Sequence, residues 1–321
     1  MNLQQVDFSK TLSDDEVYEC IMNNYSSLTR EWILHQWNWI NGAYWAFHDH
    51  YKFMIVISLV EKTLQFYDQM NIEYSYDEYY SKSYINIEKY SITELCNKLD
   101  LPKETVRRKV LELEKEGVII RTKKRIIINR KAFTYVKPEN QVKISAKYIY
   151  FVSQALNKDK IFSKKLHPSQ IENIIKKKFS LCWRWFYRMQ IPLIIGYQKT
   201  MSDLTTFHIW GTVCMNQVLN VSKSLNESTL DYKKTNQTVI NNVGSTIGIS
   251  AMSIADMTYI PRATIIRKLK YLVKEDLVKI NKKKQYMLST LNFKKILPYQ
   301  SEAFKFKAKF IRKILNLIVI S

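Results

Sequence analysis

The feature that most constrains this chain is an internal repeat, because a unit that occurs twice is expected to fold in the same way twice. The segment that begins at Ser91, SITELCNKLDLPKETVRRKVLELEKEGVIIRTKKR, aligns without gaps with SAMSIADMTYIPRATIIRKLKYLVKEDLVKINKKK, which begins at Ser250. Pro102 then meets Pro261, an offset of 261 − 102 = 159 residues. The same offset pairs Thr105 with Thr264, Arg108 with Arg267, Lys109 with Lys268, Leu113 with Leu272, Lys115 with Lys274, Glu116 with Glu275, and Lys123 and Lys124 with Lys282 and Lys283.

The apolar pattern of the first copy predicts two helices joined by a tight turn. Ile92, Leu95 and Leu99 have the i, i+3, i+7 spacing of a short amphipathic helix. A break at residues 100–102 follows, and proline is tolerated in the first turn of the next helix. That second helix buries a stripe made of Val106, Val110 and Leu113, and it leaves polar side chains near its N-terminal end facing outward, namely Lys103, Glu104, Arg107 and Arg108.

A short hairpin is predicted after the second helix. Gly117 ends the helix, and the β-branched segments VIIR and RIIIN follow as strands. Thr122, Lys123 and Lys124 lie between them, so the hairpin has a cationic tip. A helix whose N-terminal end can enter a major groove, next to a cationic hairpin that can contact phosphates, is typical of a winged helix-turn-helix unit.

The residues from Ile92 to Asn129 resemble the winged helix of bacterial regulators, and particularly the MarR-like group. In that group the recognition helix is marked by Thr, an apolar residue, any residue and then Arg. Thr105, Val106, Arg107 and Arg108 match this pattern, and so do Thr264, Ile265, Ile266 and Arg267. The resemblance implies a transcription regulator that binds double-stranded DNA, with the unit duplicated in tandem.

We predict that both recognition helices and both wings contact DNA. The predicted contact residues are Lys103, Glu104, Thr105, Arg107, Arg108, Lys123, Lys124 and Arg125 in the first unit, and Arg262, Thr264, Ile266, Arg267, Lys282, Lys283 and Lys284 in the second.

Helical stripes flank each unit in a similar order. Before the first unit, one stripe is Ile33, Trp37, Ile40, Tyr44 and Phe47, and the next is Phe53, Ile57, Val60, Leu64 and Tyr67. Before the second, Cys182, Phe186 and Met189 begin a helix that we expect Pro192 to kink, and Phe207, Trp210, Cys214, Val218 and Val221 form another. SAKYIYFVSQAL from Ser145 resembles KAKFIRKILNL from Lys307, where Phe304, Ala308, Ile311, Leu315 and Ile318 oppose Lys305, Lys309, Arg312 and Asn316.

MarR-like proteins are generally dimers held together by helices that flank the winged unit. We therefore predict a mainly α-helical fold with small β wings, two winged helix-turn-helix units and flanking dimerisation-type helices, which together make a pseudo-dimer in one chain. The first half covers residues 1–160, with its winged helix at about 90–133. The second covers residues 161–321, with its winged helix at about 249–292. The linker is expected near residues 157–168, and the chain is expected to act as a monomer, with further oligomerisation left open.

The two copies differ where bases would be read. Lys103, Glu104 and Arg107 are replaced by Arg262, Ala263 and Ile266 in the second copy. Ile266 favours contact with a thymine methyl group rather than a polar base edge. We therefore expect an asymmetric two-part site, with the first unit supplying more of the specificity.

Composition supports a folded protein with an anionic partner. The 46% hydrophobic and 13% aromatic fractions exclude a disordered chain, and 6 Gly and 6 Pro in 321 residues favour helices over a loop-rich sandwich. Lys and Arg outnumber Asp and Glu by 50 to 29, a formal charge of +21, which attracts polyanions such as nucleic acid.

The sequence also predicts where the protein acts. There is no secretory signal and no apolar run long enough to span a membrane. Cys20, Cys96, Cys182 and Cys214 are dispersed and are interpreted as reduced thiols. We therefore expect a cytoplasmic, nucleoid-associated protein.

Aromatic clusters and the C-terminal helix leave further hypotheses. Trp32, Trp37, Trp39 and Trp45 are interpreted mainly as core, with a pocket for a small-molecule effector as the alternative. The tyrosine-rich segment 74–84 is interpreted as a connecting loop, with stacking on nucleic acid as the alternative. The amphipathic C-terminal helix is expected to pack internally, the alternative being an acidic membrane surface.

We find no catalytic constellation and expect neither an enzyme, nor a cofactor, nor a metal site. His48, Asp49 and His50 resemble a metal cluster, but His at i and i+2 do not share a helix face and no third ligand is evident. There is no Gly-rich phosphate loop, GxSxG or HExxH motif.

Three functions stay open at this point. The favoured one is a transcription regulator. A replication initiator with two winged units is the second, and a protein-interaction adaptor that does not bind DNA is the third. The paired lysines at both wing tips argue against the adaptor.

Overall fold

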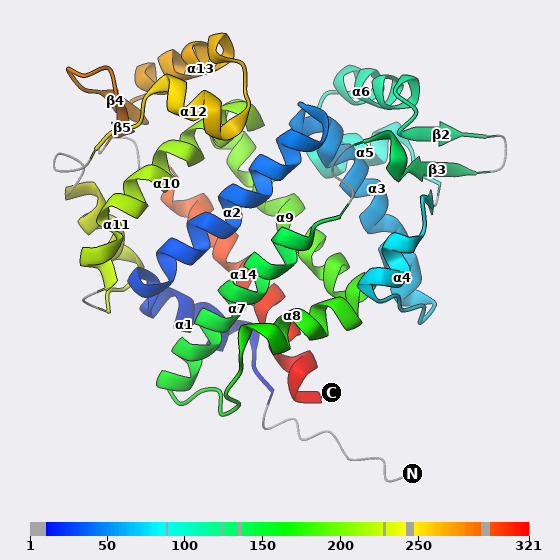
Figure 1. Ribbon diagram of the computed structural model, residues 1–321, viewed down its shortest axis with the longest axis horizontal. Coiled ribbons are helices and arrows are strands. Elements are labelled where there is room, and N and C mark those ends of the chain that lie inside the picture. Colours follow the sequence, from blue (N-terminus) through cyan, green and yellow to red (C-terminus); the bar gives the residue numbers. More distant parts are fainter. Residues whose placement is uncertain are drawn as a thin grey trace.

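Long helices from both halves of the sequence cross at the centre of the computed structural model (Figure 1). The structure describes residues 11–87, 89–122, 125–133, 137–226, 229–241, 247–289 and 296–320. Within these residues helices predominate, and the strands form two small antiparallel sheets, as the sequence predicted.

Three helices precede the first winged unit, namely α1 (Asp14–Asn23), α2 (Tyr25–Phe47) and α3 (His50–Gln69). The Ser13 hydroxyl accepts a hydrogen bond from the Glu16 N–H, and the Glu16 carboxylate accepts one from the Ser13 N–H, which fixes the start of α1. His48 adopts a left-handed conformation with φ of 50° after α2, and Asp49 caps α3. The chain therefore reverses sharply at His48 and Asp49.

The tyrosine-rich segment is more than the predicted connecting loop, because it contains α4 (Tyr76–Ser81) and β1 (Tyr84–Ile87). Ser75 and Glu78 form a capping box that starts α4. Tyr76 and Tyr79 are buried against Phe179, with ring centroids 5.1 and 5.4 Å away. These two rings therefore serve packing, and neither is free to stack on a base.

The first winged unit consists of α5 (Ile92–Leu99), α6 (Lys103–Lys115), β2 (Ile119–Arg121) and β3 (Ile126–Asn129). Its sheet has the strand order β1-β3-β2, with Ile85 and Ile119 both opposite Ile128. A 3-10 turn, η2 (Arg130–Ala132), follows. Gly117 ends α6 as predicted, since its φ of +71° is a conformation that glycine adopts without strain.

Helix α7 (Glu139–Lys158) ends this first series, and a second series of similar order follows. It consists of α8 (Pro168–Lys177), α9 (Phe179–Met201), α10 (Leu204–Asn226), α11 (Tyr232–Asn241), α12 (Ala251–Thr258), α13 (Arg262–Lys274), β4 (Val278–Ile280), β5 (Tyr286–Leu288) and α14 (Leu297–Ile320). Helix α9 continues through Pro192, where the sequence suggested a kink. Strands β4 and β5 pair antiparallel, with Val278 opposite Leu288.

Helices that are distant in sequence pack against one another at the centre. Helix α2 packs on α10, and α3 packs on α9. The C-terminal helix α14 packs on α9 and α1, while α7 packs on α2 and α8. Gln36 of α2 donates a hydrogen bond to Gln190 of α9, with Nε2 3.1 Å from Oε1, and both side chains are buried.

Two serines make matching contacts at opposite ends of the core. The Ser26 N–H donates to the Leu230 carbonyl, and the Leu230 N–H donates to the Ser26 hydroxyl at 2.8 Å. Ser180 and Tyr74 repeat this arrangement, with the Tyr74 N–H 2.9 Å from the Ser180 hydroxyl oxygen. Each contact joins the start of a long helix, α2 or α9, to a segment from the other half of the chain.

Helix α14 buries the predicted apolar stripe but also buries polar residues. Asn316 does not face outward with the lysines as expected, because its amide bonds the backbone N–H and carbonyl of Leu12 at 2.8 and 2.9 Å. Lys307 is fully buried, with Nζ 3.2 Å from His35 Nδ1. Internal packing of this helix is thus the arrangement observed. No helix in the described part of the chain is both long and apolar enough to cross a membrane.

Candidate nucleic-acid interface

The N-terminal half of α6 presents the predicted polar side chains to solvent. Lys103, Glu104, Arg107 and Arg108 are exposed, and Thr105 is half-buried. Val106, Val110 and Leu113 are buried on the opposite stripe, as predicted. The Arg108 side chain is 63% exposed and lies 3.9 Å from Glu112, so it keeps most of its surface for an external partner.

Helix α13 repeats this arrangement with different chemistry. Arg262, Ala263 and Arg267 are exposed, whereas Thr264 and Ile266 are half-buried. Ile265, Leu269 and Leu272 form the buried stripe. The exposed start of α13 carries no carboxylate, whereas α6 carries Glu104 in its first turn.

Helices α6 and α13 both begin without a side-chain cap. Pro102 and Pro261 occupy the N-cap positions, and neither can supply a side-chain acceptor. By contrast, Ser91 and Ser250 cap the preceding helices α5 and α12. Uncapped N–H groups at a helix N-terminus favour an anion such as a phosphate.

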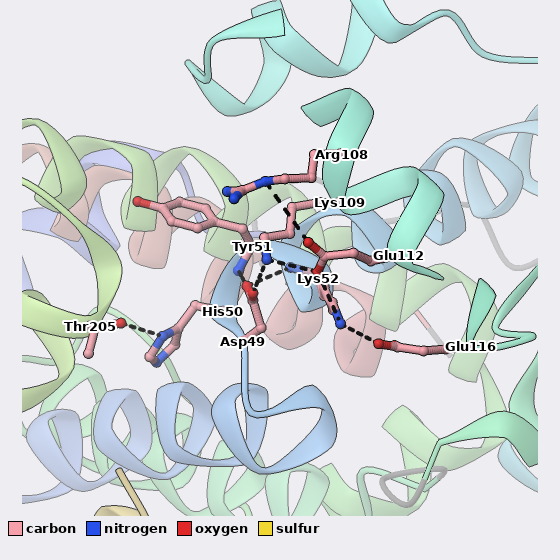
Figure 2. A network of polar contacts seen from close by, with 9 residues as sticks. All are labelled: Asp49, His50, Tyr51, Lys52, Arg108, Lys109, Glu112, Glu116 and Thr205. Carbon is pink, nitrogen blue, oxygen red and sulfur yellow. Dashed lines mark hydrogen bonds and ion pairs between the residues drawn. The ribbon is translucent and has the colours of Figure 1, made fainter. Parts of the chain in front are cut away.

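Lys109 does not face outward with Arg108 but fixes α6 to α3 (Figure 2). Its Nζ lies 2.7 Å from Asp49 Oδ2 and 2.9 Å from Glu112 Oε2. Lys52 of α3 contacts the same Glu112 at 3.2 Å and Glu116 at 2.5 Å. The result is a chain of alternating charges between the capped start of α3 and the middle of α6.

The Asp49 carboxylate is held in its charged form. Burial alone would raise its pKa, but the hydrogen bond and charge of Lys109, with the backbone N–H groups of Lys52 and Tyr51, hold the pKa below its usual value. The second unit has one equivalent contact: Lys268 of α13 pairs with Asp203, whose Oδ1 caps α10 through the Thr206 N–H at 2.8 Å. The sequence alignment paired Lys109 with Lys268 but did not reveal this docking role.

The turns before α6 and α13 also each contact a long helix from the other half of the chain. Asp100, in the turn between α5 and α6, lies 3.3 Å from Lys199 of α9. Tyr259, in the turn between α12 and α13, packs edge-on against Trp45 of α2 with centroids 4.6 Å apart. The first turn is therefore held by charge and the second by an aromatic contact. The sequence analysis missed both.

The wing tips are cationic where they are described. Lys282, Lys283 and Lys284 are exposed in a turn that Asn281 organises, since its Oδ1 accepts hydrogen bonds from the Lys283 and Gln285 N–H groups at 2.9 Å. In the first wing Arg125 is exposed, and the Thr122 hydroxyl donates to its carbonyl. Lys123 and Lys124 lie outside the described residues.

The residues that resembled a metal cluster serve other roles. Asp49 holds Lys109, and His50 Nε2 lies 3.2 Å from His208 Nδ1 in the core. Burial lowers the pKa of His50 to about 4 and lowers that of His208 well below its usual value. Among the described residues, no group of three or more His, Cys, Asp or Glu side chains is arranged to hold a metal ion.

The predicted tryptophan cluster divides between core and small cavities. Trp32 and Trp39 are buried, and Trp45 is 44% exposed. Trp32 and Trp37 line one cavity of about 60 Å³, and Trp39 lines another of about 60 Å³. Ligand pockets usually measure roughly 300 to 1,000 Å³, so neither cavity has room for an effector of ordinary size without rearrangement.

The helix-turn-helix geometry, the exposed cationic helix and the adjoining wing define a winged helix-turn-helix unit, which suggests DNA-binding transcription regulation. Residues 85–132 match the DeoR-like helix-turn-helix domain. The match begins at β1, earlier than the predicted boundary near residue 90, and it is to the DeoR-like rather than the MarR-like type. Comparison with curated proteins and with solved structures gave no match.

Proposed function

We propose that this protein is a sequence-specific transcription regulator that reads an asymmetric two-part DNA site with α6 and α13. The observation that carries the proposal is that these two helices, each with an uncapped N-terminus and exposed arginines, lie at the same edge of one core (Figure 1). One duplex lying along that edge could reach both helices.

The internal contacts support a tandem pseudo-dimer with a MarR-like layout, divided into residues 1–160 and 161–321. The packing of α1 on α14 corresponds to that of α8 on α7, and the packing of α2 on α10 to that of α9 on α3. The two serine contacts correspond in the same way, and Gln36 bonds Gln190. Two copies of one subunit would make such reciprocal contacts around a two-fold axis.

Unequal recognition helices support an asymmetric site. Glu104 favours a cytosine amino group and opposes phosphate, whereas Ala263 at the matching position does neither. We therefore infer that α6 supplies more base discrimination and that the start of α13 supplies more phosphate contact.

The proposal is tested by measuring binding to a site obtained by in vitro selection. Arg108→Ala should weaken binding by about 1 to 3 kcal/mol and relax the preference at one base position. Replacing Lys282, Lys283 and Lys284 by Ala should weaken binding to all sequences alike. With about eight phosphates neutralised, log affinity should fall with log salt at a slope of roughly −7. Selection of a perfect inverted repeat would contradict the asymmetry, and a flat salt dependence would favour an adaptor.

The replication initiator is the second candidate, supported by the divergence between α6 and α13. A genome-wide binding map separates the two, because promoters and a single replication origin give different patterns. We also propose that the protein acts as a cytoplasmic, nucleoid-associated monomer and has no enzymatic activity. A small-molecule effector that changes DNA binding is a further part of the proposal.

A further inference from the structure

A groove that is separate from the recognition helices runs between α9 and α14. On α9, one helical stripe is formed by Trp185, Arg188, Pro192, Ile195 and Lys199. On α14, the facing stripe is formed by Tyr299, Glu302, Phe306, Lys309 and Lys313. Between residues 187–199 of α9 and 299–306 of α14, the space closed on one side by α3 and α5 has a volume of about 730 Å³. Trp185, Lys309 and Lys313 continue the two stripes beyond this space.

Apolar side chains form the floor of the groove, while Glu61, paired with Lys98, and Glu302, paired with Lys305, also line it. Pro192, Ile195 and Phe306 line it and are half-buried, and Tyr299 remains 39% exposed. Gly196 lies on the floor near Tyr299, and a Cβ there would make an ordinary contact with the tyrosine ring at 3.7 Å, whereas a longer side chain would occupy the groove. Residues 185 to 199 span about 21 Å along a helix axis, which is long enough for a peptide segment.

Three cations along this groove have no carboxylate partner in the described part of the chain. Arg188 and Lys309 are exposed and take part in no ion pair there. Lys313 lies 4.9 Å from the centroid of the Trp185 ring, a cation–π contact that does not neutralise its charge.

The pKa of Lys313 fits this crowding of like charges. Burial, with the charges of Arg188, Arg312, Lys309 and Arg184, lowers it to about 8. Of these neighbours, Arg312 is paired with Asp14 of α1, and Arg184 with Asp68 of α3. An added anion would relieve the remaining repulsion.

In the proposed two-fold arrangement, the other half of the molecule carries an anion at the matching place. Helices α2 and α7 occupy there the places of α9 and α14, and Glu31 of α2 stands where α9 has Trp185. Glu31 lies 3.2 Å from Lys147, which matches Lys309. The α9–α14 groove thus has an aromatic ring in place of the carboxylate, and its cations are left for an external partner.

We propose that the α9–α14 groove binds an acidic, amphipathic segment of a partner protein. Carboxylates of such a segment would face Arg188, Lys309 and Lys313, and its aliphatic or aromatic side chains would lie on the floor at Pro192 and Phe306. A second copy of this chain is a poor occupant, because the chain carries a net charge of +21. The apolar floor disfavours a nucleic-acid backbone, and α14 runs away from α6 and α13 to the opposite edge (Figure 1).

The test uses the full-length protein and a fluorescent acidic peptide of about 16 residues, Glu and Asp with Leu or Phe at every third or fourth position. A groove variant carries Arg188→Glu, Lys309→Glu and Lys313→Glu. A control with the same change in net charge carries Lys143→Glu, Lys158→Glu and Lys234→Glu, all at exposed positions elsewhere. Gly196→Leu fills the floor without changing charge, and a peptide with Ser in place of Leu and Phe tests the apolar contribution.

The groove variant should bind the peptide at least about tenfold more weakly than the wild type, because three favourable charge contacts become repulsive, and the control should bind within about twofold. Gly196→Leu and the Ser peptide should each weaken binding as well. Equal loss in groove variant and control would reduce the effect to net charge and overturn the proposal. Absence of peptide binding, or a groove variant that selectively loses binding to duplex DNA of random sequence, would overturn it too.

Discussion

Lys307 shows how a single buried residue can make stability depend on pH. Among the described residues no carboxylate forms an ion pair with it: Nζ faces His35 Nδ1 at 3.2 Å and lies 4.2 Å from the centroid of the Trp32 ring. His35 Nε2 in turn lies 3.1 Å from the Ser145 hydroxyl oxygen. Burial holds the pKa of Lys307 well below its usual value, and burial and the Lys307 charge do the same for His35. In the folded protein, burial therefore favours the neutral form of both groups.

We predict that Lys307→Met stabilises the protein at pH 7 and flattens its pH dependence. At pH values between the lowered pKa of folded Lys307 and the ordinary lysine pKa, Lys307 carries a proton in the unfolded wild-type chain but not in the folded one. Stability should therefore rise with pH in that window by up to about 1.4 kcal/mol per unit. Urea unfolding at neutral and mildly alkaline pH measures this. A variant less stable than the wild type at both pH values, with an unchanged slope, would mean that Lys307 is charged in the core.

Helices α6 and α13 are each held in place by a carboxylate that also caps another helix. Asp49 caps α3 and also holds Lys109 of α6, while Asp203 caps α10 and holds Lys268 of α13. The position of each recognition helix therefore depends on a carboxylate in a different part of the sequence.

Asp49→Asn isolates this docking contact, since asparagine also caps helices but carries no charge. We expect the free energy of unfolding to fall by about 1 to 2 kcal/mol, a value between those for exposed and for buried ion pairs. DNA binding should also weaken, while the base preference should stay unchanged. Because the pKa of Asp49 is lowered in the folded state, the contribution of its charge is present at neutral pH and disappears as pH falls through that pKa. Asp203→Asn is the matched change in the second unit. A changed base preference in either variant would show that the carboxylate acts on DNA directly.

Element boundaries near the repeat could be predicted because local chemistry determines them. Gly117 ends α6, and the stripe of Val106, Val110 and Leu113 faces inward as its spacing required. Helix α4 and strand β1 were missed, although Ser75 and Glu78 have capping-box spacing and Ile85 and Ile87 alternate with polar residues. Their tyrosines suggested a polar loop, and only long-range contacts with Phe179 reveal why they are buried.

Contacts between the two halves could not be predicted, because no local pattern encodes them. Lys199 with Asp100 and Trp45 with Tyr259 pair residues whose separation in sequence carries no periodic signal. Both contacts lie at helix-turn-helix turns, where they orient the recognition helices with respect to the core. The exposure of Lys103, Arg107 and Arg108 followed from the helical pattern, but the placement of α6 relative to α13 required the whole molecule.

At the scale of the whole molecule, α6 and α13 do not belong to two domains joined only by a flexible linker. The helices between them are buried against one another, with α2 on α10 and α3 on α9, and His50 meets His208 at 3.2 Å in this core. A linker would let each unit find its half-site independently, with an effective concentration that falls slowly with distance. A packed core fixes both the separation and the rotation of the two helices.

Binding should therefore tolerate almost no change in half-site spacing. Inserting about 5 base pairs between the half-sites places them on opposite faces of the duplex, and we expect affinity to fall to that of one half-site. Inserting about 10 base pairs restores the face but lengthens the separation by roughly 34 Å, and affinity should stay low because the core cannot extend. This is measured by titrating the original duplex and the two duplexes with insertions at one salt concentration. The affinity of the Arg267→Ala variant for the original duplex gives the reference value for binding by one helix. Recovery of affinity at the longer insertion would mean that the halves separate, and the packed core would then not set the distance between α6 and α13 on DNA.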